Sequence, residues 1–363
     1  MQNVNKKERD EIMDENKMIT VGRLRNMVTP DDKGKTCSTM LYMARAFDID
    51  LFLFELKDVN YTSKTINGHF FESGKMIRRV VPIPPLIDNE TGVYDDRLLK
   101  QCFFTRRLKR PSKYSTYKYL YENEVYREIL IPTAYVNSVN EVIDSFDRFD
   151  TNNIVLKPDT DAEGRGVFQA SKQASKQASK YIITSGTEKR EYTEVELCEH
   201  LNGVFSKNYI VQPMIHSRTK NGNPYDIRVR SAKYGTGYAT MLYARTGNPA
   251  GFVSNVSTGG YAVPIELFLK QEFGDKWRNL LNDLLRFGRQ FPLHYQKFFD
   301  DLLFEIAMDV GISKTEDGYK FHLFEANSFP SNRIDWGGAR GIDLIKAYFR
   351  YFHYVYKNYI NKQ

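Results

Sequence analysis

Apolar residues in the first third of the chain follow strand-like and helix-like spacing in turn. A helical stretch at 38–46 precedes the compact apolar run Ile49–Glu55. A run of this length, flanked by charged residues, predicts a strand buried on both faces. We therefore expect an α/β unit over about 18–107, in which 82–85 and 88–92 carry the Pro, Gly and Asn typical of loops.

The middle of the chain combines helical patterns with a hairpin. Tyrosines at helical spacing over 113–124 predict a helix, and the strand-like run Asn153–Pro158 is followed by a Gly-containing loop and a second strand. Residues 170–180 repeat an Ala-Ser-Lys-Gln unit without an apolar side chain larger than Ala, so we expect a hairpin tip or small insertion outside the core. Tyr209–Pro213 predicts a further strand that ends at proline.

The last third mixes hairpins with long amphipathic helices. The patterns predict strands at 226–234, 238–245, 302–310 and 320–327, an amphipathic stretch at 265–295, and a final helix at 341–360. Strands interleaved with helices, with hairpins in the later part, predict an α/β or α+β class.

Composition bounds the kind of protein. With 363 residues, the chain suggests two or three domains at about 150 residues each. Its 41% hydrophobic and 27% charged residues are typical of globular proteins, and its formal charge of +7 favours anionic partners. One short basic run at 106–110 is typical of a solvated or phosphate-facing segment, so we expect no nucleic-acid partner.

The targeting and cysteine patterns indicate a cytoplasmic protein. The charged start lacks the apolar run of a signal peptide, and no stretch approaches the ~18 apolar residues of a membrane span. Cys37, Cys102 and Cys198 are widely spaced and odd in number, so we expect reduced thiols.

Acidic side chains gather on one face of the last predicted hairpin. Side-chain alternation places Leu323, Glu325 and Asn327 on one face of their strand, and the hairpin would bring Asp309 beside them. Carboxylates in such proximity favour a cation between them, and Mg²⁺ prefers oxygen ligands. The pattern alone allows a magnesium site or acids solvated at a strand end.

Basic side chains occur at other strand ends. Lys157 ends an apolar strand, where it either extends to solvent or reaches a phosphate beside the following Gly-containing loop. Arg228, Arg230 and Arg245 on neighbouring strands fit either an anionic ligand or surface salt bridges. The chain contains no Walker motif, no strand-linked Gly-x-Gly-x-x-Gly and no Gly-x-Ser-x-Gly elbow.

Taken in order, these segments resemble the ATP-grasp superfamily, most closely its branch of endospore-coat-associated, YheC/YheD-like proteins. The matching segments are PSKY at 111–114, VLKP at 155–158, GRGV at 164–167, YIVQ at 209–212, DIRV at 226–229, NVSTGG at 255–260, EIAMD at 305–309 and FEANS at 324–328. They span roughly residues 110–330, and the preceding α/β unit looks like the N-terminal domain of this family.

The resemblance implies an ATP-grasp fold, with a Rossmann-like N-terminal α/β domain and two α+β subdomains that grip ATP. The implied division is a polar leader at 1–17, an N-terminal domain at 18–107, and an ATP-grasp domain at 108–356 with a lid subdomain at about 133–211 and a C-terminal subdomain at about 212–356.

The resemblance also implies roles for individual residues. ATP phosphates would contact Lys113 and Lys157 under the loop 160–167, which contains Gly164, Arg165 and Gly166. The adenine-facing hinge would consist of Gln212, Pro213, Met214 and Ile215. Magnesium would be held by Asp309, Glu325 and Asn327. The transferred phosphoryl group or the acyl phosphate would face Arg228, Arg230, Arg245 and Asn255, and the acceptor side would be lined by Ser331, Arg333 and Trp336.

The activity implied by this resemblance is that of an ATP-dependent carboxylate–amine ligase, which forms an amide or peptide-like bond through an acyl phosphate. Its partners would be a small-molecule or peptide carboxylate and an amine, without a membrane partner, and a homo-oligomer is compatible with the pattern. Two alternatives remain open: an ATP-grasp kinase with a small-molecule acceptor, and a non-catalytic nucleotide-binding assembly protein.

Overall fold

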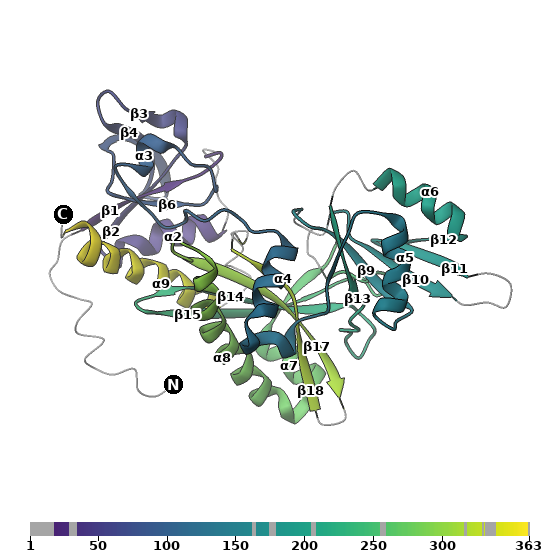
Figure 1. Cartoon of the computed structure of the whole chain (residues 1–363). Helices are drawn as coiled ribbons and strands as arrows, with labels where there is room; N and C mark the ends of the chain where they lie inside the picture. The colour runs from purple at the N-terminus through teal and green to yellow at the C-terminus, as the bar shows by residue number, and fades with distance from the viewer. Residues whose placement is uncertain are drawn as a thin grey trace.

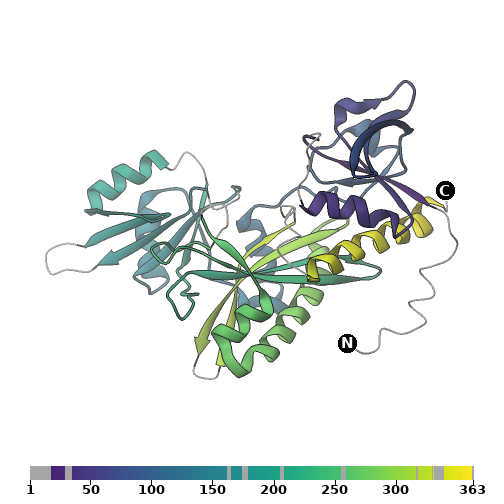
Figure 2. The same cartoon turned by 180° about the vertical axis from the view of Figure 1, so that it is seen from behind.

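The computed structural model contains three β-sheets with their covering helices (Figures 1 and 2). It describes residues 18–28, 35–161, 165–173, 179–204, 208–254, 259–315, 318–328, 330 and 339–361. A seven-stranded and a six-stranded sheet lie at opposite ends of the molecule, and a five-stranded sheet lies between them. The predicted leader 1–17 is outside the described residues. No helix of the described part is long and apolar enough to cross a membrane.

The N-terminal sheet has the strand order β3-β4-β2-β1-β6-β7, with β5 paired to β4. Its strands are β1 (Ile19–Leu24), β2 (Ile49–Phe54), β3 (Val59–Asn60), β4 (Thr65–Glu72), β5 (Lys75–Pro82), β6 (Leu86–Asn89) and β7 (Phe103–Phe104), with α2 (Lys35–Arg45), α3 (Asp96–Leu99) and the 3-10 turn η1 (Leu56–Asp58). The buried strand predicted at 49–55 is confirmed, because only Asp50 in β2 is partly exposed. The predicted loop at 88–92 is wrong at its start, since Asp88 and Asn89 end β6 and are fully buried.

The six-stranded sheet has the order β12-β11-β10-β9-β13-β8. It contains β8 (Ala134–Val136), β9 (Asn153–Pro158), β10 (Phe168–Gln173), β11 (Lys180–Ser185), β12 (Glu188–Tyr192) and β13 (Tyr209–Pro213), with α5 (Val139–Arg148) and α6 (Glu194–Val204). The predicted β9–β10 hairpin is confirmed by antiparallel pairing. The repeat was expected outside the core, but Ala170 lies in β10 and is fully buried; residues 174–178 are outside the described part.

The five-stranded sheet, in the order β16-β15-β14-β17-β18, forms the centre of the molecule. It consists of β14 (Tyr225–Tyr234), β15 (Gly237–Thr246), β16 (Tyr261–Pro264), β17 (Glu305–Thr315) and β18 (Gly318–Asn327). The other elements around it are α4 (Lys113–Glu122), α7 (Ile265–Phe273), α8 (Trp277–Tyr295), α9 (Ala339–Val355), the 3-10 turns η2 (Glu124–Ile129), η4 (Gly274–Lys276) and η5 (Gln296–Phe298), and the π-helical turn η7 (Tyr356–Ile360). The stretch predicted as one amphipathic segment is two helices, because Gly274 adopts φ 53° after α7.

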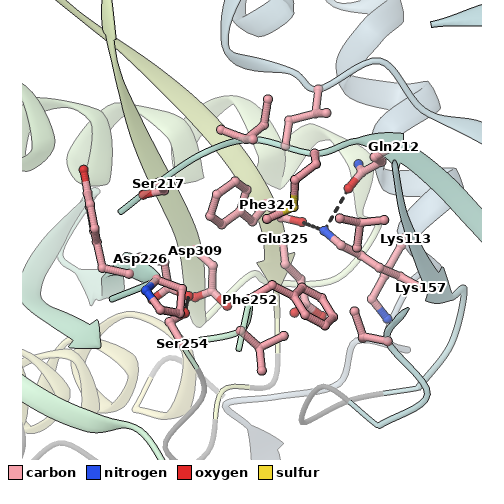
Figure 3. Close-up of a pocket in the computed structure, with 18 of the residues that line it drawn as sticks. Lys113, Lys157, Gln212, Ser217, Asp226, Phe252, Ser254, Asp309, Phe324 and Glu325 are labelled. Carbon is pink, nitrogen blue, oxygen red and sulfur yellow. Dashed lines mark hydrogen bonds between the residues drawn. The ribbon is translucent and has the colours of Figure 1, made fainter. Parts of the chain in front are cut away.

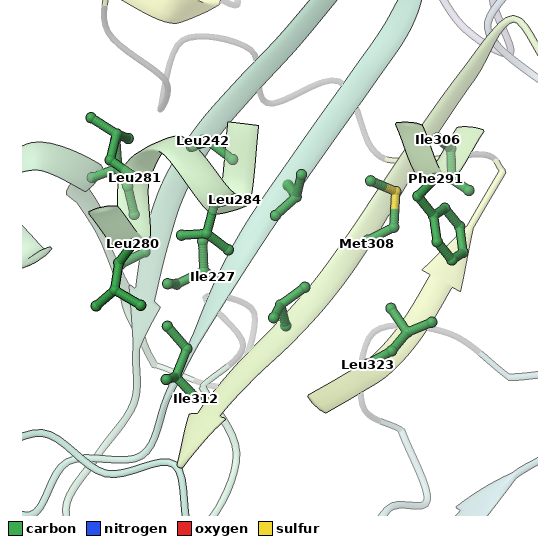
Figure 4. Packing of buried hydrophobic residues seen from close by; sticks show 14 of the residues in the cluster. Ile227, Leu242, Leu280, Leu281, Leu284, Phe291, Ile306, Met308, Ile312 and Leu323 are labelled. Atoms are coloured by element: carbon green, nitrogen blue, oxygen red, sulfur yellow. The ribbon is translucent and has the colours of Figure 1, made fainter. Parts of the chain in front are cut away.

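Helices cover the two faces of the central sheet differently. On one face, Leu284 and Phe291 of α8 pack against apolar side chains of the sheet such as Ile227 and Met308 (Figure 4). On the other face, α9 packs against one end of the sheet together with residues of β1 and β2. The remainder of that second face carries charged side chains and borders the cleft described below.

A β-bulge sets which side chains of β18 face the cleft. Asp309 is paired with Glu325, whereas its neighbour Val310 is paired with Leu323, so Phe324 is an extra residue in β18. The predicted common face of Asp309, Glu325 and Asn327 is confirmed, since Asn327 pairs with Ala307 two residues along the same face. The prediction was wrong for Leu323, which the bulge turns to the apolar face with Val310.

Candidate functional site

A cleft separates the six-stranded sheet from the charged face of the central sheet (Figure 3). Its empty space is about 1020 Å³, open solvent included, and both charged and apolar side chains line it. The predicted site residues that line it are Lys113, Lys157, Arg165, Gln212, Pro213, Met214, Ile215, Asp309 and Glu325. The fold thus brings together residues more than 200 positions apart in the chain, from Lys113 to Glu325.

Two lysines project into the cleft. Lys157 Nζ, at the end of β9, lies 2.8 Å from Gln212 Oε1 and 3.5 Å from the carbonyl oxygen of Phe324. Lys113 Nζ, from the first turn of α4, donates to the carbonyl oxygens of Pro158, at 2.9 Å, and Asp161. Both ammonium groups therefore bind neutral oxygens, which an anionic ligand can replace with a stronger, charge-assisted interaction.

Burial changes the proton affinity of one of these lysines. Desolvation lowers the pKa of Lys157 to about 8, and the negative charge of Glu325 opposes this effect only in part. Although part of the side chain faces the cleft, few water molecules can surround its ammonium group. Lys157 is thus charged at neutral pH and close to losing its proton in mildly alkaline solution.

The hinge segment is fixed by hydrogen bonds to the six-stranded sheet. Gln212 Nε2 donates to Thr133 Oγ1 at 2.8 Å, which leaves Gln212 Oε1 directed at Lys157. The backbone N–H of Met214 donates to the carbonyl oxygen of Asn153 at 2.9 Å. Pro213, Met214 and Ile215 therefore present a rigid, mostly apolar wall suited to a planar ring.

Carboxylates lie on the opposite wall. Asp309 and Glu325 face each other across the β17–β18 ladder, and Asn327 lines a smaller adjoining cavity that also reaches Glu325. In the part of the chain that the structure describes, no three His, Cys, Asp or Glu side chains lie so that they could hold a metal ion together. The predicted set is instead two carboxylates and one amide. Among the described residues, Asp309 Oδ1 accepts no hydrogen bond although it is buried. These hard oxygen donors fit Mg²⁺, which is usually held by one or two carboxylates plus substrate phosphates.

Two arginines surround Asp309. Arg228 Nε lies 2.5 Å from Asp309 Oδ1, and Arg245 Nη2 lies 2.7 Å from Asp309 Oδ2. Arg245 also forms a bidentate pair with Asp226, at 2.7 and 2.6 Å, and the hydroxyl of Ser254 donates to the same carboxylate at 2.6 Å. Asp226, Ser254 and Asp309 line the cleft, whereas Arg228 and Arg245 are not among its lining residues and lie behind these carboxylates. Together they form a cluster of alternating charges beside the cleft.

Arg230 lies outside the charged cluster around Asp309, contrary to the prediction that it faces a phosphoryl group. It is 1% exposed and pairs with Glu305, whose carboxylate also binds Arg106 at 2.6 Å and the hydroxyl of Tyr348. The physical reason is its position on β14, two residues beyond Arg228. Two residues along a strand move a side chain about 6.6 Å, which here places Arg230 under α9 and away from the cleft.

The same network corrects the interpretation of the basic run. Arg106 was expected to be solvated or to face phosphate, but it is 6% exposed and joins Glu305 of β17 to Asp88 of β6, at 3.0 Å. Burial would raise the pKa of Glu305, yet the charges of Arg230 and Arg106 outweigh it and lower the pKa to about 2. This buried network connects the N-terminal sheet to the strand that carries Asp309.

The structure describes only part of the predicted phosphate loop at 160–167. Arg165 lines the cleft, and Gly166 has φ 68° with the position of a Cβ atom only 2.9 Å from Pro158, so a side chain there would be strained. Gly164 and Asn255 lie outside the described residues. So do the three residues predicted for the acceptor side, Ser331, Arg333 and Trp336.

Some site residues were missed by sequence reasoning. Asp226 gave a signal, since it shares a strand face with Arg228, but it was not assigned to the site. Ser254 and Phe252 follow a Gly-Asn-Pro-rich segment without periodicity, so nothing in the pattern marks them. Phe324 would have read as an ordinary strand residue, because a bulge has no reliable sequence signature.

Comparison with solved structures finds proteins similar to this chain. D-cycloserine synthetase DcsG is similar with a TM-score of 0.52 at 12% identity, over 92% of this chain and 99% of that one. An N5-carboxyaminoimidazole ribonucleotide synthetase, solved as its ADP complex, gives 0.47 at 12% identity over 91% and 77%. D-alanine–D-alanine ligase from Bacillus anthracis, complexed with ATP, gives 0.46 at 12% identity over 93% and 99%.

The fold and the cleft define the class as ATP-grasp, a class that includes ATP-dependent ligases that form C–N bonds. Within it, the chain belongs to the YheC/D-like ATP-grasp family, whose pattern matches residues 101–355. The family and the fold class expected from the sequence are thereby confirmed. No curated protein sequence is significantly similar to the chain.

Proposed function

We propose that this protein is a carboxylate–amine ligase that uses ATP to make an amide or peptide-like bond through an acyl phosphate. One observation carries the proposal: two lysines, Lys113 and Lys157, lie on one wall of the cleft, and two carboxylates, Asp309 and Glu325, lie on the other. Such a pair of walls suits a triphosphate and its divalent cation. Membership of the ATP-grasp class supports the same conclusion.

The residues divide the work of holding ATP. The adenine ring packs against the hinge of Gln212, Pro213, Met214 and Ile215, and the phosphates take the place of the neutral oxygens now bound by Lys113 and Lys157. Mg²⁺, when bound to Asp309, Glu325 and Asn327, supplies charge neutralisation for the phosphates. Gly164, Arg165 and Gly166 cover the phosphates from the loop side.

The reaction proceeds in two displacements. A carboxylate oxygen of the first substrate attacks the γ-phosphorus, and the bond between that phosphorus and the ADP oxygen breaks. The amine nitrogen of the second substrate then attacks the acyl carbon, the bond from that carbon to the phosphate oxygen breaks, phosphate leaves, and the nitrogen loses a proton to solvent water. Arg228, Arg245 and Asn255 stabilise the transferring group by charge and hydrogen bonding, which is the principal demand of phosphoryl transfer.

The proposal also covers the substrates and the cellular compartment. The substrates are a small-molecule or peptide carboxylate and an amine. The enzyme works in the cytoplasm, which contains ATP and Mg²⁺. Two cysteines, Cys102 and Cys198, are not in disulfides, which agrees with a reducing compartment.

The test is an incubation with ATP, Mg²⁺ and mixed libraries of carboxylates and amines, followed by mass spectrometry. The proposal expects condensed products, and release of ADP and phosphate only when both substrate types are supplied. A stable phosphorylated product formed without any amine would instead show a kinase. Nucleotide binding without turnover in every library would show a non-catalytic protein, and Glu325→Gln serves as the inactive control.

A further inference from the structure

The two arginines beside Asp309 differ in how many carboxylates hold them. Arg245 is gripped bidentately by Asp226, which Ser254 also supports, so it keeps a full ion pair without Asp309. Within the described part of the chain, Arg228 pairs with a single carboxylate, that of Asp309. Loss of Asp309 as a partner would thus release Arg228 and leave Arg245 in place.

The contact of Arg228 with Asp309 is close but poorly aligned. Arg228 Nε and Asp309 Oδ1 lie 2.5 Å apart, yet neither atom has a hydrogen-bond partner among the described residues. The one aligned bond, from Arg228 Nη2 to Asp309 Oδ2, is 3.2 Å long. A charge-assisted hydrogen bond is normally both shorter and straighter, so this pair is held mainly by Coulomb attraction.

A divalent cation on Asp309 would compete with that attraction. The two guanidinium groups together balance the charges of Asp309 and Asp226, and a further double positive charge on Asp309 would repel both arginines. Arg245 has Asp226 to retain it, whereas Arg228 does not. The repulsion should therefore displace Arg228, which pairs with no second carboxylate among the described residues.

From this asymmetry we propose that Arg228 is a displaceable side chain, which pairs with Asp309 in this structure and is expelled toward the phosphoryl group when a divalent cation binds. The inference rests on the proposed function for the identity of that group, but not for the displacement. It makes the arginine available only once the metal is present. Arg228 would then stabilise a transferring phosphoryl group with the charge that previously neutralised Asp309.

The test is Mn²⁺ binding without nucleotide, followed by electron paramagnetic resonance on the full chain. Arg228→Met removes the competing charge and should tighten Mn²⁺ binding about tenfold, whereas Arg228→Lys keeps the charge and should stay within about twofold of wild type. Arg218→Met is the matched control, because Arg218 lines the cleft that Asp309 also lines but donates to carbonyl oxygens of Gly222 and Gly251. Its Mn²⁺ affinity should equal that of wild type.

A second readout does not depend on the Met variant. In wild-type protein the Arg228 Nε–H signal, assigned by its absence from the Arg228→Lys spectrum, should shift on addition of Mg²⁺. Equal Mn²⁺ affinity of Arg228→Met and wild type, including no binding by either, overturns the inference, as does an unmoved Arg228 signal at saturating Mg²⁺ and ADP. Neither measurement needs turnover, so absent ligase products would count against the proposed function alone.

Discussion

Replacement of Glu305 by glutamine removes the charge at the centre of the buried network while it preserves the shape of the side chain. The pKa of Glu305 falls from 4.5 to about 2, after Arg230 and Arg106 overcome the effect of burial. At about 1.4 kcal/mol per pH unit, that fall corresponds to about 3 kcal/mol of stability. Loss of one partner from a buried ion pair typically costs 3–5 kcal/mol, which agrees with this estimate.

The sign of the pH dependence follows from the lowered pKa. The contribution of Glu305 is fully present above the unfolded value near 4.5 and disappears as the pH falls through about 2. The difference in unfolding free energy between wild type and Glu305→Gln should therefore be about 3 kcal/mol at pH 7 and about 2 kcal/mol at pH 3.5.

The assay is urea unfolding monitored by circular dichroism at both pH values. Asp283→Asn is the control, because Asp283 forms an exposed pair with Arg286 on α8 and such pairs contribute less than about 1 kcal/mol. A loss below about 1 kcal/mol for Glu305→Gln at pH 7, equal to the control, would refute the reasoning.

Other predictions concern the cleft itself. ATP affinity, measured by calorimetry, should fall roughly tenfold per pH unit above about 8 as Lys157 loses its proton; Lys157→Arg, which stays charged, should abolish that fall, and an unchanged profile would contradict the pKa. Glu325→Gln should abolish Mg²⁺-dependent turnover with an unaltered circular dichroism spectrum, and near-normal activity would exclude the metal role. Gly311→Ala places a Cβ 2.2 Å from the Phe324 ring and should weaken ATP binding, whereas Gly288→Ala, with a Cβ 2.4 Å from Thr240 under α8, should cost about 1–3 kcal/mol of stability and leave ATP binding intact. Equal ATP affinities of the two glycine variants would show that the Phe324 ring does not form part of the nucleotide wall.

Local patterns predicted most of the elements because their signals are local. The β9 and β13 strands were predicted at their observed bounds, since each is a short apolar run that a proline terminates. The common face of Asp309 and Glu325 also followed from alternation and a turn-rich connection. Each of these inferences uses only a few neighbouring residues, for which period and turn chemistry are reliable guides.

Non-local features could not be predicted in the same way. The bulge at Phe324 depends on how β17 and β18 pair, so alternation placed Leu323 on the wrong face. Asp88 was assigned to a loop because Asp, Asn and Gly occur close together at 88–92. Its charge is nevertheless buried against Arg23 and Arg106, which are 65 and 18 positions away in the sequence. A polar residue in a core is explained only by its partners, and single-sequence patterns do not reveal partners.

Arg228 and Arg230 show what the tertiary structure adds to the same alternating pattern. Both lie on one face of β14, so their spacing alone predicts an anionic ligand for each of them. Arg230 meets Glu305 where Arg106 and α9 close the network, so its charge is committed to stability. Arg228 pairs with Asp309, which lines the cleft. A ligand that binds Asp309 therefore competes with Arg228 for the same carboxylate. The difference between a structural and an exchangeable arginine thus arises from a shift of two residues along β14 relative to the edge of the cleft.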